Sequence, residues 1–209
     1  MGQVIVVTDT CACVPEEMAN QLGLEVVPYY IHRGQETLRD MVDVRQEEFF
    51  RWLPTATELP KTANPGPGDY LEAWQRAAAR GATALAVICM TSKGSGAFQS
   101  ASVAKEMAVK ELPGLAVEVV DTLQVSMAHG WAVIEAARAA QARASLKEVV
   151  EVAKEVARKA VMIQTADTLR YLYMGGRIGR AQHLVGSLLN IKPLIGMEDG
   201  IIVPLGTAR

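Results

Sequence analysis

Hydroxyl groups and glycines meet in one short stretch, residues 91–96, with the sequence Thr-Ser-Lys-Gly-Ser-Gly. An apolar run of strand length, Ala84–Met90, precedes it, and apolar residues recur at helical spacing over Ala97–Ala104. The pattern predicts a strand, a tight loop and a helix. Glycines let the backbone approach a ligand, and the first N–H groups of a helix lack intrahelical partners. With the hydroxyls of Ser92 and Ser95, this loop suits an anionic group, although a loop that merely caps a helix would have the same composition.

Strands alternate with helices through most of the chain. Further buried-type strands are expected at Val4–Val7 and Ala116–Val120, and they run into Thr8–Thr10 and Asp121–Thr122. Such alternation predicts an α/β fold with a mainly parallel sheet flanked by helices, in which ligands bind at the carboxyl ends of the strands. Those ends are rich in hydroxyls and carboxylates here.

The pattern changes near residue 160. A strand over Val161–Thr165, a glycine loop at Gly175–Gly179 and a hairpin turning at Met197–Gly200 follow. We therefore expect an N-terminal α/β domain over residues 1–159 and a second, smaller α/β domain over residues 160–209.

Three local expectations concern the region between the first helix and the central strand. Glu25–His32 is typical of one strand, with Pro28 at an edge or a bulge. Asp43 is placed to cap a helix over Val44–Leu53. Residues 54–68 form the longest loop signal in the chain, and long loops are commonly functional.

Composition excludes several classes of function. The formal net charge is -2, and Lys and Arg are scattered among acidic residues, which argues against nucleic-acid binding. Apolar runs stop well short of the ~20 residues of a membrane-spanning helix. The first strand passes directly into Thr8 and Asp9 rather than into a signal peptide, so we expect a cytoplasmic protein.

The cysteines do not predict a metal site. Cys11 and Cys13 are one residue apart and Cys89 lies in the apolar strand, with no Cys-x-x-Cys pair and no His at ligand spacing. We expect neither a metal nor a cofactor.

A serine hydrolase using Ser95 is the alternative function. His129 and His183 are the candidate bases, and Asp9 and Asp121 are the candidate orienting acids. The Gly-x-Ser-x-Gly elbow is absent, because Lys rather than Gly stands two residues before Ser95. Phosphate-binding glycine motifs are absent too, and a scaffold module without a ligand is the third interpretation.

An ordered set of motifs covers nearly the whole chain. It comprises Thr8-Asp9-Thr10, Val27-Pro28, Thr62 with Pro65, Ser92 to Gly96, Val120-Asp121, Asp167-Thr168-Leu169 with Tyr171-Leu172, Gly175-Gly176-Arg177-Ile178, Leu189-Asn190-Ile191-Lys192-Pro193 and Asp199-Gly200. In its order and spacing this set resembles the DegV family. The resemblance implies a two-domain protein that binds one long-chain fatty acid between its domains without catalysis. In some members a separate fatty acid kinase phosphorylates the presented carboxylate.

By position, the resemblance places the carboxylate contacts on Thr62 and Ser95. Ser92, Gly94 and Gly96 belong to the same ligand-binding loop. Arg177 is either a contact for the partner kinase or the residue that holds its own glycine turn by pairing with a carboxylate.

The chain departs from the family pattern in places. Ala63, Ala97 and Thr10 stand where the family usually has Ser, Thr and Ser, and loss of the first two hydroxyls would weaken or re-aim the head-group contacts. Family members usually continue beyond Arg209, so we expect a second domain that is incomplete at the C-terminus. We expect such a chain to self-associate or to hold its fatty acid less tightly.

Overall fold

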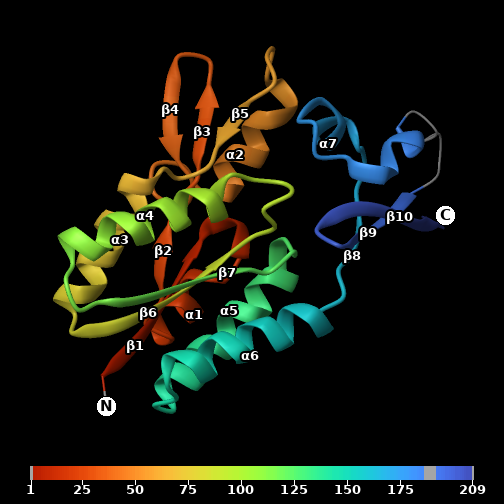
Figure 1. Ribbon diagram of the computed structural model, residues 1–209. Helices are drawn as coiled ribbons and strands as arrows, with labels where there is room; N and C mark the ends of the chain where they lie inside the picture. The colour runs from red at the N-terminus through yellow and green to blue at the C-terminus, as the bar shows by residue number, and fades with distance from the viewer. Residues whose placement is uncertain (1, 186–191, 209) are drawn as a thin grey trace.

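A parallel sheet forms the centre of the protein (Figure 1), whose computed structural model describes residues 2–185 and 192–208. Its strand order is β2-β1-β6-β7. The strands are β1 (Gln3–Asp9), β2 (Glu25–Val27), β6 (Ala82–Cys89) and β7 (Ala116–Asp121). The prediction of an α/β fold with a mainly parallel sheet is confirmed.

Helices cover both faces of this sheet because its strands alternate their buried side chains between two cores. Ile5, Val7 and Leu85 pack on one face, and Val6 and Ala86 pack on the other. The first core is closed by α3 (Pro67–Ala79) and α4 (Ala97–Glu111). The second is closed by α1 (Glu16–Gln21), α5 (Ser126–Gln141) and α6 (Leu146–Lys159).

The strand order reverses between β1 and β6, which pair in parallel. After β1 the chain passes through a short 3₁₀ turn, η1 (Thr10–Ala12), to α1 on one face, whereas after β6 it passes to α4 on the other. The loops that follow these strands therefore diverge at the carboxyl edge of the sheet. Such a divergence is where ligands bind in open α/β sheets.

The expectation of one strand over Glu25–His32 is wrong. Proline has no N–H to donate to a ladder, and Pro28 separates β2 from β3 (Tyr30–Arg33), which belongs to another sheet. This second sheet is antiparallel, in the order β4-β3-β5, with β4 over Glu36–Arg39 and β5 over Lys61–Ala63. Part of the predicted long loop is therefore a strand.

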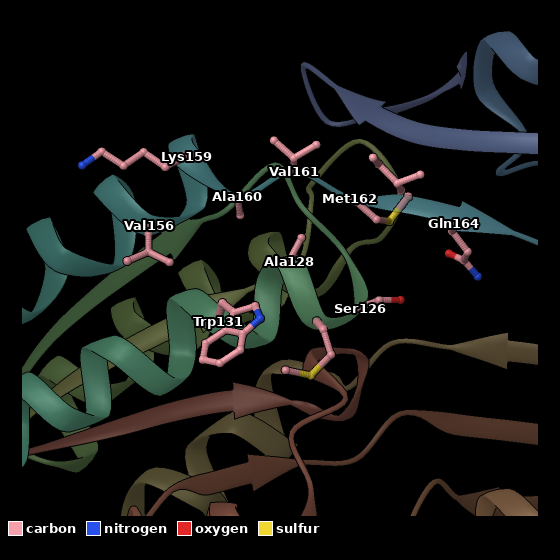
Figure 2. Close-up of a pocket in the computed structure, with 11 residues that line it drawn as sticks. Ser126, Ala128, Trp131, Val156, Lys159, Ala160, Val161, Met162 and Gln164 are labelled. Atoms are coloured by element: carbon pink, nitrogen blue, oxygen red, sulfur yellow. The ribbon is translucent and has the colours of Figure 1, made fainter. Parts of the chain in front are cut away.

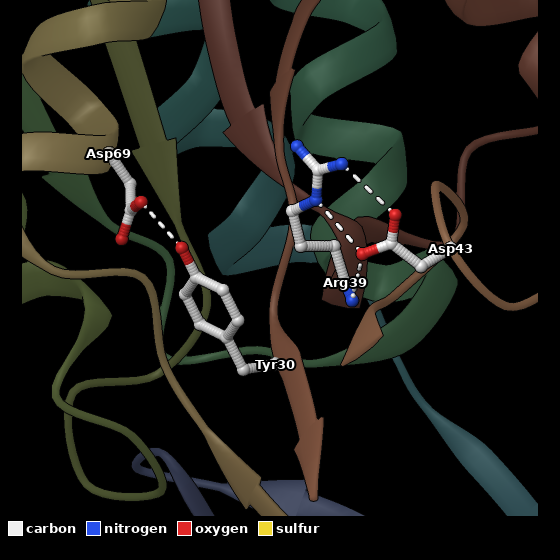
Figure 3. Close-up of polar contacts among 4 residues, drawn as sticks. All are labelled: Tyr30, Arg39, Asp43 and Asp69. Atoms are coloured by element: carbon white, nitrogen blue, oxygen red, sulfur yellow. Dashed lines mark hydrogen bonds and ion pairs between the residues drawn. The ribbon is translucent and has the colours of Figure 1, made fainter. Parts of the chain in front are cut away.

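Asp43 does not cap a helix, contrary to expectation. Its carboxylate accepts hydrogen bonds from the Arg39 backbone N–H at 2.8 Å and from Arg39 Nε at 2.9 Å (Figure 3), and these bonds lower the pKa of Asp43 to about 2. The following helix, α2, begins at Gln46 and ends at Trp52, and a short 3₁₀ turn, η2 (Leu53–Thr55), follows it. The Asp43 carboxylate, which the sequence pattern predicts to cap the helix, is thus bound by Arg39 instead.

A third sheet lies beyond α6 and is antiparallel, in the order β10-β9-β8 (Figure 1). Its strands are β8 (Ile163–Thr165), β9 (Lys192–Glu198) and β10 (Ile201–Ala208). We call this sheet, with α7 (Arg170–Met174) and η3 (Gly179–Leu184), the second unit.

The predicted hairpin at the end of the chain is confirmed, with β9 and β10 joined through Asp199 and Gly200. The boundary between residues 159 and 160 stays a prediction. Of the predicted Leu189–Pro193 motif, residues 189–191 lie outside the described residues. Among the described helices, none is long and apolar enough to cross a membrane.

His129 is fully buried against the carboxyl half of the parallel sheet. Its Nε2 lies 3.1 Å from the carbonyl oxygen of Ile88 and 3.2 Å from Thr8 Oγ1. A carbonyl only accepts, so Nε2 carries the proton, and among the described residues Nδ1 has no hydrogen-bond partner. Burial lowers the pKa of His129, and the charge of Asp9 opposes this only in part.

This burial predicts an acid-sensitive step in stability. Below pH ~6.5 a histidine in the unfolded chain binds a proton, whereas His129 in the folded chain stays neutral because its pKa is lower. The free energy of unfolding therefore decreases as the pH falls, by up to ~1.4 kcal/mol per pH unit. We expect His129→Gln to flatten the dependence of the unfolding free energy on pH between about 7.5 and 5.5, measured by urea denaturation. The exposed His183→Gln is the control, and an unchanged slope in His129→Gln would contradict the assignment.

Candidate functional site

The glycine loop of residues 91–96 leaves the sheet between β6 and α4, as the sequence predicts. Both neighbouring strands fix its start: Asp9 Oδ2 accepts a hydrogen bond from Met90 N at 3.4 Å, and Asp121 Oδ1 accepts one from Ser92 N at 3.2 Å. Gly94 N donates to Thr91 O within the loop at 3.1 Å. The loop therefore has a defined conformation at the point where the strand order reverses.

Ser95 lies against a buried phenol. Its Oγ is 2.5 Å from the hydroxyl of Tyr29 and accepts a hydrogen bond from Ala97 N, at the start of α4, at 3.2 Å. The Tyr29 side chain packs with Met90 and Ala97, and burial raises its pKa, so its hydroxyl keeps its proton at neutral pH. The serine thus sits between a phenol and a helix N-terminus.

Thr62 lies on β5 and is exposed, opposite Ile31 of β3 in the antiparallel ladder. Two residues on, Asn64 Nδ2 donates to Ser100 Oγ of α4 at 3.1 Å. A Cβ at Gly96 would lie 2.9 Å from Asn64 Oδ1, so glycine permits this close approach. The strand that carries Thr62 is therefore anchored to the helix that follows Ser95.

A second contact anchors the start of α3, which follows the strand that carries Thr62, to β3. The Tyr30 hydroxyl donates to Asp69 Oδ1 at 2.6 Å (Figure 3), and Asp69 Oδ2 accepts from Gly66 N at 2.7 Å at the start of α3. Tyr30 adjoins Tyr29, the partner of Ser95. The second sheet thus joins the elements that carry the two predicted carboxylate contacts.

Arg177 reaches the same loop from the second unit. Its Nε donates to the carbonyl oxygen of Gly94 at 3.1 Å, and its Nη1 donates to Gly175 O at 2.6 Å. The side chain is exposed, and these two partners are carbonyl oxygens rather than the carboxylate that we expected to pair with Arg177. Its role as a partner contact stays a prediction.

Ser95 does not contact His129 or Asp9, two residues of the hydrolase alternative. In the described parts of the chain, Ser95 Oγ bonds to Tyr29 and Ala97, whereas His129 Nε2 lies beside Thr8 and Ile88. Asp9 accepts from backbone amides. A nucleophile, a base and an orienting acid in mutual contact are therefore not built around Ser95. In residues 2–185 and 192–208 there is also no cluster of three or more potential metal ligands.

An apolar groove of about 630 Å³ runs between α5, α6 and the segment leading into β8 (Figure 2). Its lining residues are Ser126, Met127, Ala128, Trp131, Val156, Lys159, Ala160, Val161, Met162, Ile163 and Gln164. Trp131, Val161 and Ile163 are largely exposed there. The groove does not include Thr62 or Ser95, so the hydroxyl groups and this apolar surface are separate features.

Tyr29 is the site residue that sequence reasoning missed. An aromatic residue in a run of strand type is usually a packing residue, and its contact with Ser95 spans 66 positions. The available signal was its place directly after Pro28, at the carboxyl end of β2, on the edge where ligand groups were expected.

Comparisons with known proteins agree on one family. The family model described as "Uncharacterised protein, DegV family" matches residues 3–209. A DegV domain-containing protein of Caldanaerobacter subterraneus is 34% identical over 209 residues, which are 100% of this chain and 72% of that protein.

Solved structures give the same answer. A DegV family protein from Thermus thermophilus, described by its fatty acid binding, is 31% identical with a TM-score of 0.87, over 99% of this chain and 72% of that one. DegV from Bacillus subtilis, described as a fatty acid binding protein, is 27% identical with a TM-score of 0.85, over 100% of this chain and 73% of that one. The resemblance carried by the sequence motifs is therefore confirmed, and this chain belongs to the DegV family.

Proposed function

We propose that this protein binds one long-chain fatty acid, whose carboxylate is held by Thr62 and Ser95 and whose chain lies between the parallel-sheet unit and the second unit. Relatives described as fatty acid binding support the ligand class. The loop of Ser92, Gly94 and Gly96 supplies the remaining surface around the head group. The protein itself performs no reaction.

The arrangement of hydrogen bonds at Ser95 carries this proposal. Ser95 Oγ accepts from Ala97 N, and the phenol of Tyr29 is positioned to donate to the same oxygen. Either hydroxyl can donate in this pair; when Tyr29 donates, both lone pairs of Ser95 Oγ are engaged and the serine proton is free for a ligand. An outward hydroxyl at a helix N-terminus is a suitable donor for a carboxylate.

Tyr29 also bears on the departures from the family pattern. Ala63 and Ala97 lack the hydroxyls that the family usually has, and both flank this site. The phenol of Tyr29 brings a hydroxyl to Ser95 from a third element. We infer that the Tyr29 hydroxyl changes the direction of the Ser95 contact with the carboxylate and compensates for part of the missing hydroxyls.

The acyl chain requires apolar walls. The groove of Figure 2 is apolar and provides Trp131, Val156 and Met162 where α5 and α6 meet the segment leading to β8. It does not include Thr62 or Ser95, so we do not assign it to the chain of a fatty acid whose carboxylate is bound by these hydroxyls. Burial of each CH₂ group between apolar walls would contribute ~0.8 kcal/mol.

A separate fatty acid kinase is the partner that would act on the bound carboxylate. The exposure of Ser92, Gly96 and Arg177 at the proposed head-group site supports presentation of the carboxylate to another protein. Arg177 is the residue we propose to contact that kinase.

Protein purified without added lipid should carry a fatty acid. The acyl chain gains enough from burial to survive dilution and chromatography. Solvent extraction followed by mass spectrometry should find a saturated or monounsaturated long-chain species close to one per chain. Extracts at background level from both cell-derived protein and protein incubated with oleate would contradict the proposal.

The hydroxyls should matter for the charged head group specifically. We expect Ser95→Ala and Thr62→Ala each to cost roughly 1.5–3 kcal/mol of affinity for a fatty acid, and Tyr29→Phe roughly 0.5–1.5 kcal/mol. Titration calorimetry with the fatty acid and with its primary amide separates the head-group contribution from that of the acyl chain. The variants should lose less affinity for the amide, because its head group carries no charge. Retained affinity for the acid in the Thr62/Ser95 double variant would place the head group elsewhere.

The isolated chain should be inert toward esters and ATP. Ser95 lacks a contacting base, so a p-nitrophenyl ester should hydrolyse no faster than with denatured protein. Turnover that is lost in Ser95→Ala and kept in Ser92→Ala would favour the hydrolase alternative.

A further inference from the structure

Two hydrogen bonds join the second unit to the glycine loop of residues 91–96, one at the first residue of the loop and one at Gly94. Arg177 Nε donates to Gly94 O at 3.1 Å, and Thr91 Oγ1 donates to Gly200 O at 2.9 Å. Thr91 is buried at the start of the loop, and Gly200 is the turn of the β9–β10 hairpin. Two segments of the second unit, the turn between α7 and η3 and the β9–β10 turn, therefore contact the loop that carries Ser95.

The hairpin turn fits its position closely. Gly200 has a φ of +77°, and a Cβ there would lie 2.6 Å from Thr91 Oγ1 and 3.0 Å from Leu123 Cδ2. A side chain would push the hairpin away from the loop, so glycine is required for the contact as well as for the turn.

The Arg177 bond fixes more than one atom. A peptide unit is planar and trans, so the carbonyl of Gly94 and the N–H of Ser95 lie in one plane and point in opposite directions. Holding the carbonyl toward Arg177 thereby orients the N–H of Ser95 away from it. The same plane contains the Cα atom of Ser95, from which its side chain departs.

We propose that Arg177 is a positioning residue for the fatty-acid carboxylate: by holding the Gly94–Ser95 peptide plane, it aims the N–H of Ser95, while Thr91 and Gly200 fix the start of the same loop. The inference rests on the proposed function and concerns the same site. Arg177 acts here from the second unit on a loop of the first. Binding of the head group and docking of the second unit are therefore coupled, each favouring the other.

The test compares Arg177→Ala and Thr91→Val with Arg180→Ala. Arg180 belongs to the second unit too and pairs with Glu198 at 2.8 Å, and among the described residues no hydrogen bond joins Arg180 to residues 91–96. We expect Arg177→Ala and Thr91→Val each to weaken oleate binding roughly two- to tenfold, as for one lost hydrogen bond, with a smaller effect on the primary amide of oleate. Arg180→Ala should change neither affinity. Equal losses for acid and amide in Arg177→Ala would reduce Arg177 to a merely structural role.

Hydrogen exchange of the ligand-free protein provides the second measurement. A peptide covering residues 91–97 should exchange faster in Arg177→Ala than in wild type or Arg180→Ala, because the loop loses its anchor. Unchanged exchange would overturn the positioning role. If the wild-type chain binds no oleate while exchange still responds to Arg177, the proposed function fails and the anchoring of the loop stands.

A kinase-only role for Arg177 gives a different result. Arg177→Ala would then bind oleate with wild-type affinity and show wild-type exchange in residues 91–97. That pair of observations would refute the positioning role.

Discussion

The carboxyl end of β6 is the constraint around which the molecule is arranged. This strand is buried on both faces and ends at the edge of the sheet where the strand order reverses. The backbone N–H and C=O groups just beyond its end no longer pair with a neighbouring strand and need other hydrogen-bond partners. Asp9 accepts from Met90 N, and Thr122 donates its hydroxyl to Cys89 O at 2.9 Å. Side chains at the ends of both neighbouring strands thus hold the first residues of the loop in a fixed conformation.

The residues that follow Met90 are held by segments far apart in the chain. Tyr29 from the end of β2, Asn64 from the loop after β5, and Arg177 and Gly200 from the second unit all approach the loop or the start of α4. A site assembled from distant segments exists only in the folded chain. Its geometry is therefore set by the packing of both units, whereas its chemistry is set by a few hydroxyls and backbone amides.

Local patterns predicted the parts of the fold that local forces determine. The apolar strand before Thr91, the glycine loop, the helix after it and the Asp199-Gly200 hairpin each have a signature within a few residues, and the structure has all four. The family resemblance, carried by ordered motifs, then supplied Thr62 and Ser95 as candidate contacts. The structure places them on neighbouring, mutually anchored elements.

What the sequence did not predict depends on partners distant in sequence or on competition between neighbours. Residues 61–63 form a strand because β3 pairs with them, and nothing within the loop signals that partner. Asp43 has the residue type of a helix cap, but the guanidinium of Arg39 offers it a charged partner. Tyr29 has the composition of a packing residue, and only the fold shows its hydroxyl beside Ser95.

Hydroxyls as the proposed carboxylate contacts, on Thr62 and Ser95, are consistent with presentation of a carboxylate. A nearby Arg or Lys would stabilise the carboxylate charge and make the oxygen a poorer nucleophile toward a phosphoryl donor. Lys93 is part of the loop itself, and Arg177 is a second cation at it, with its Nε and Nη1 engaged by the carbonyls of Gly94 and Gly175. These two donors therefore bind the backbone of the loop and of the glycine turn, so this contact between Arg177 and the loop is a hydrogen bond to a peptide group and not an ion pair.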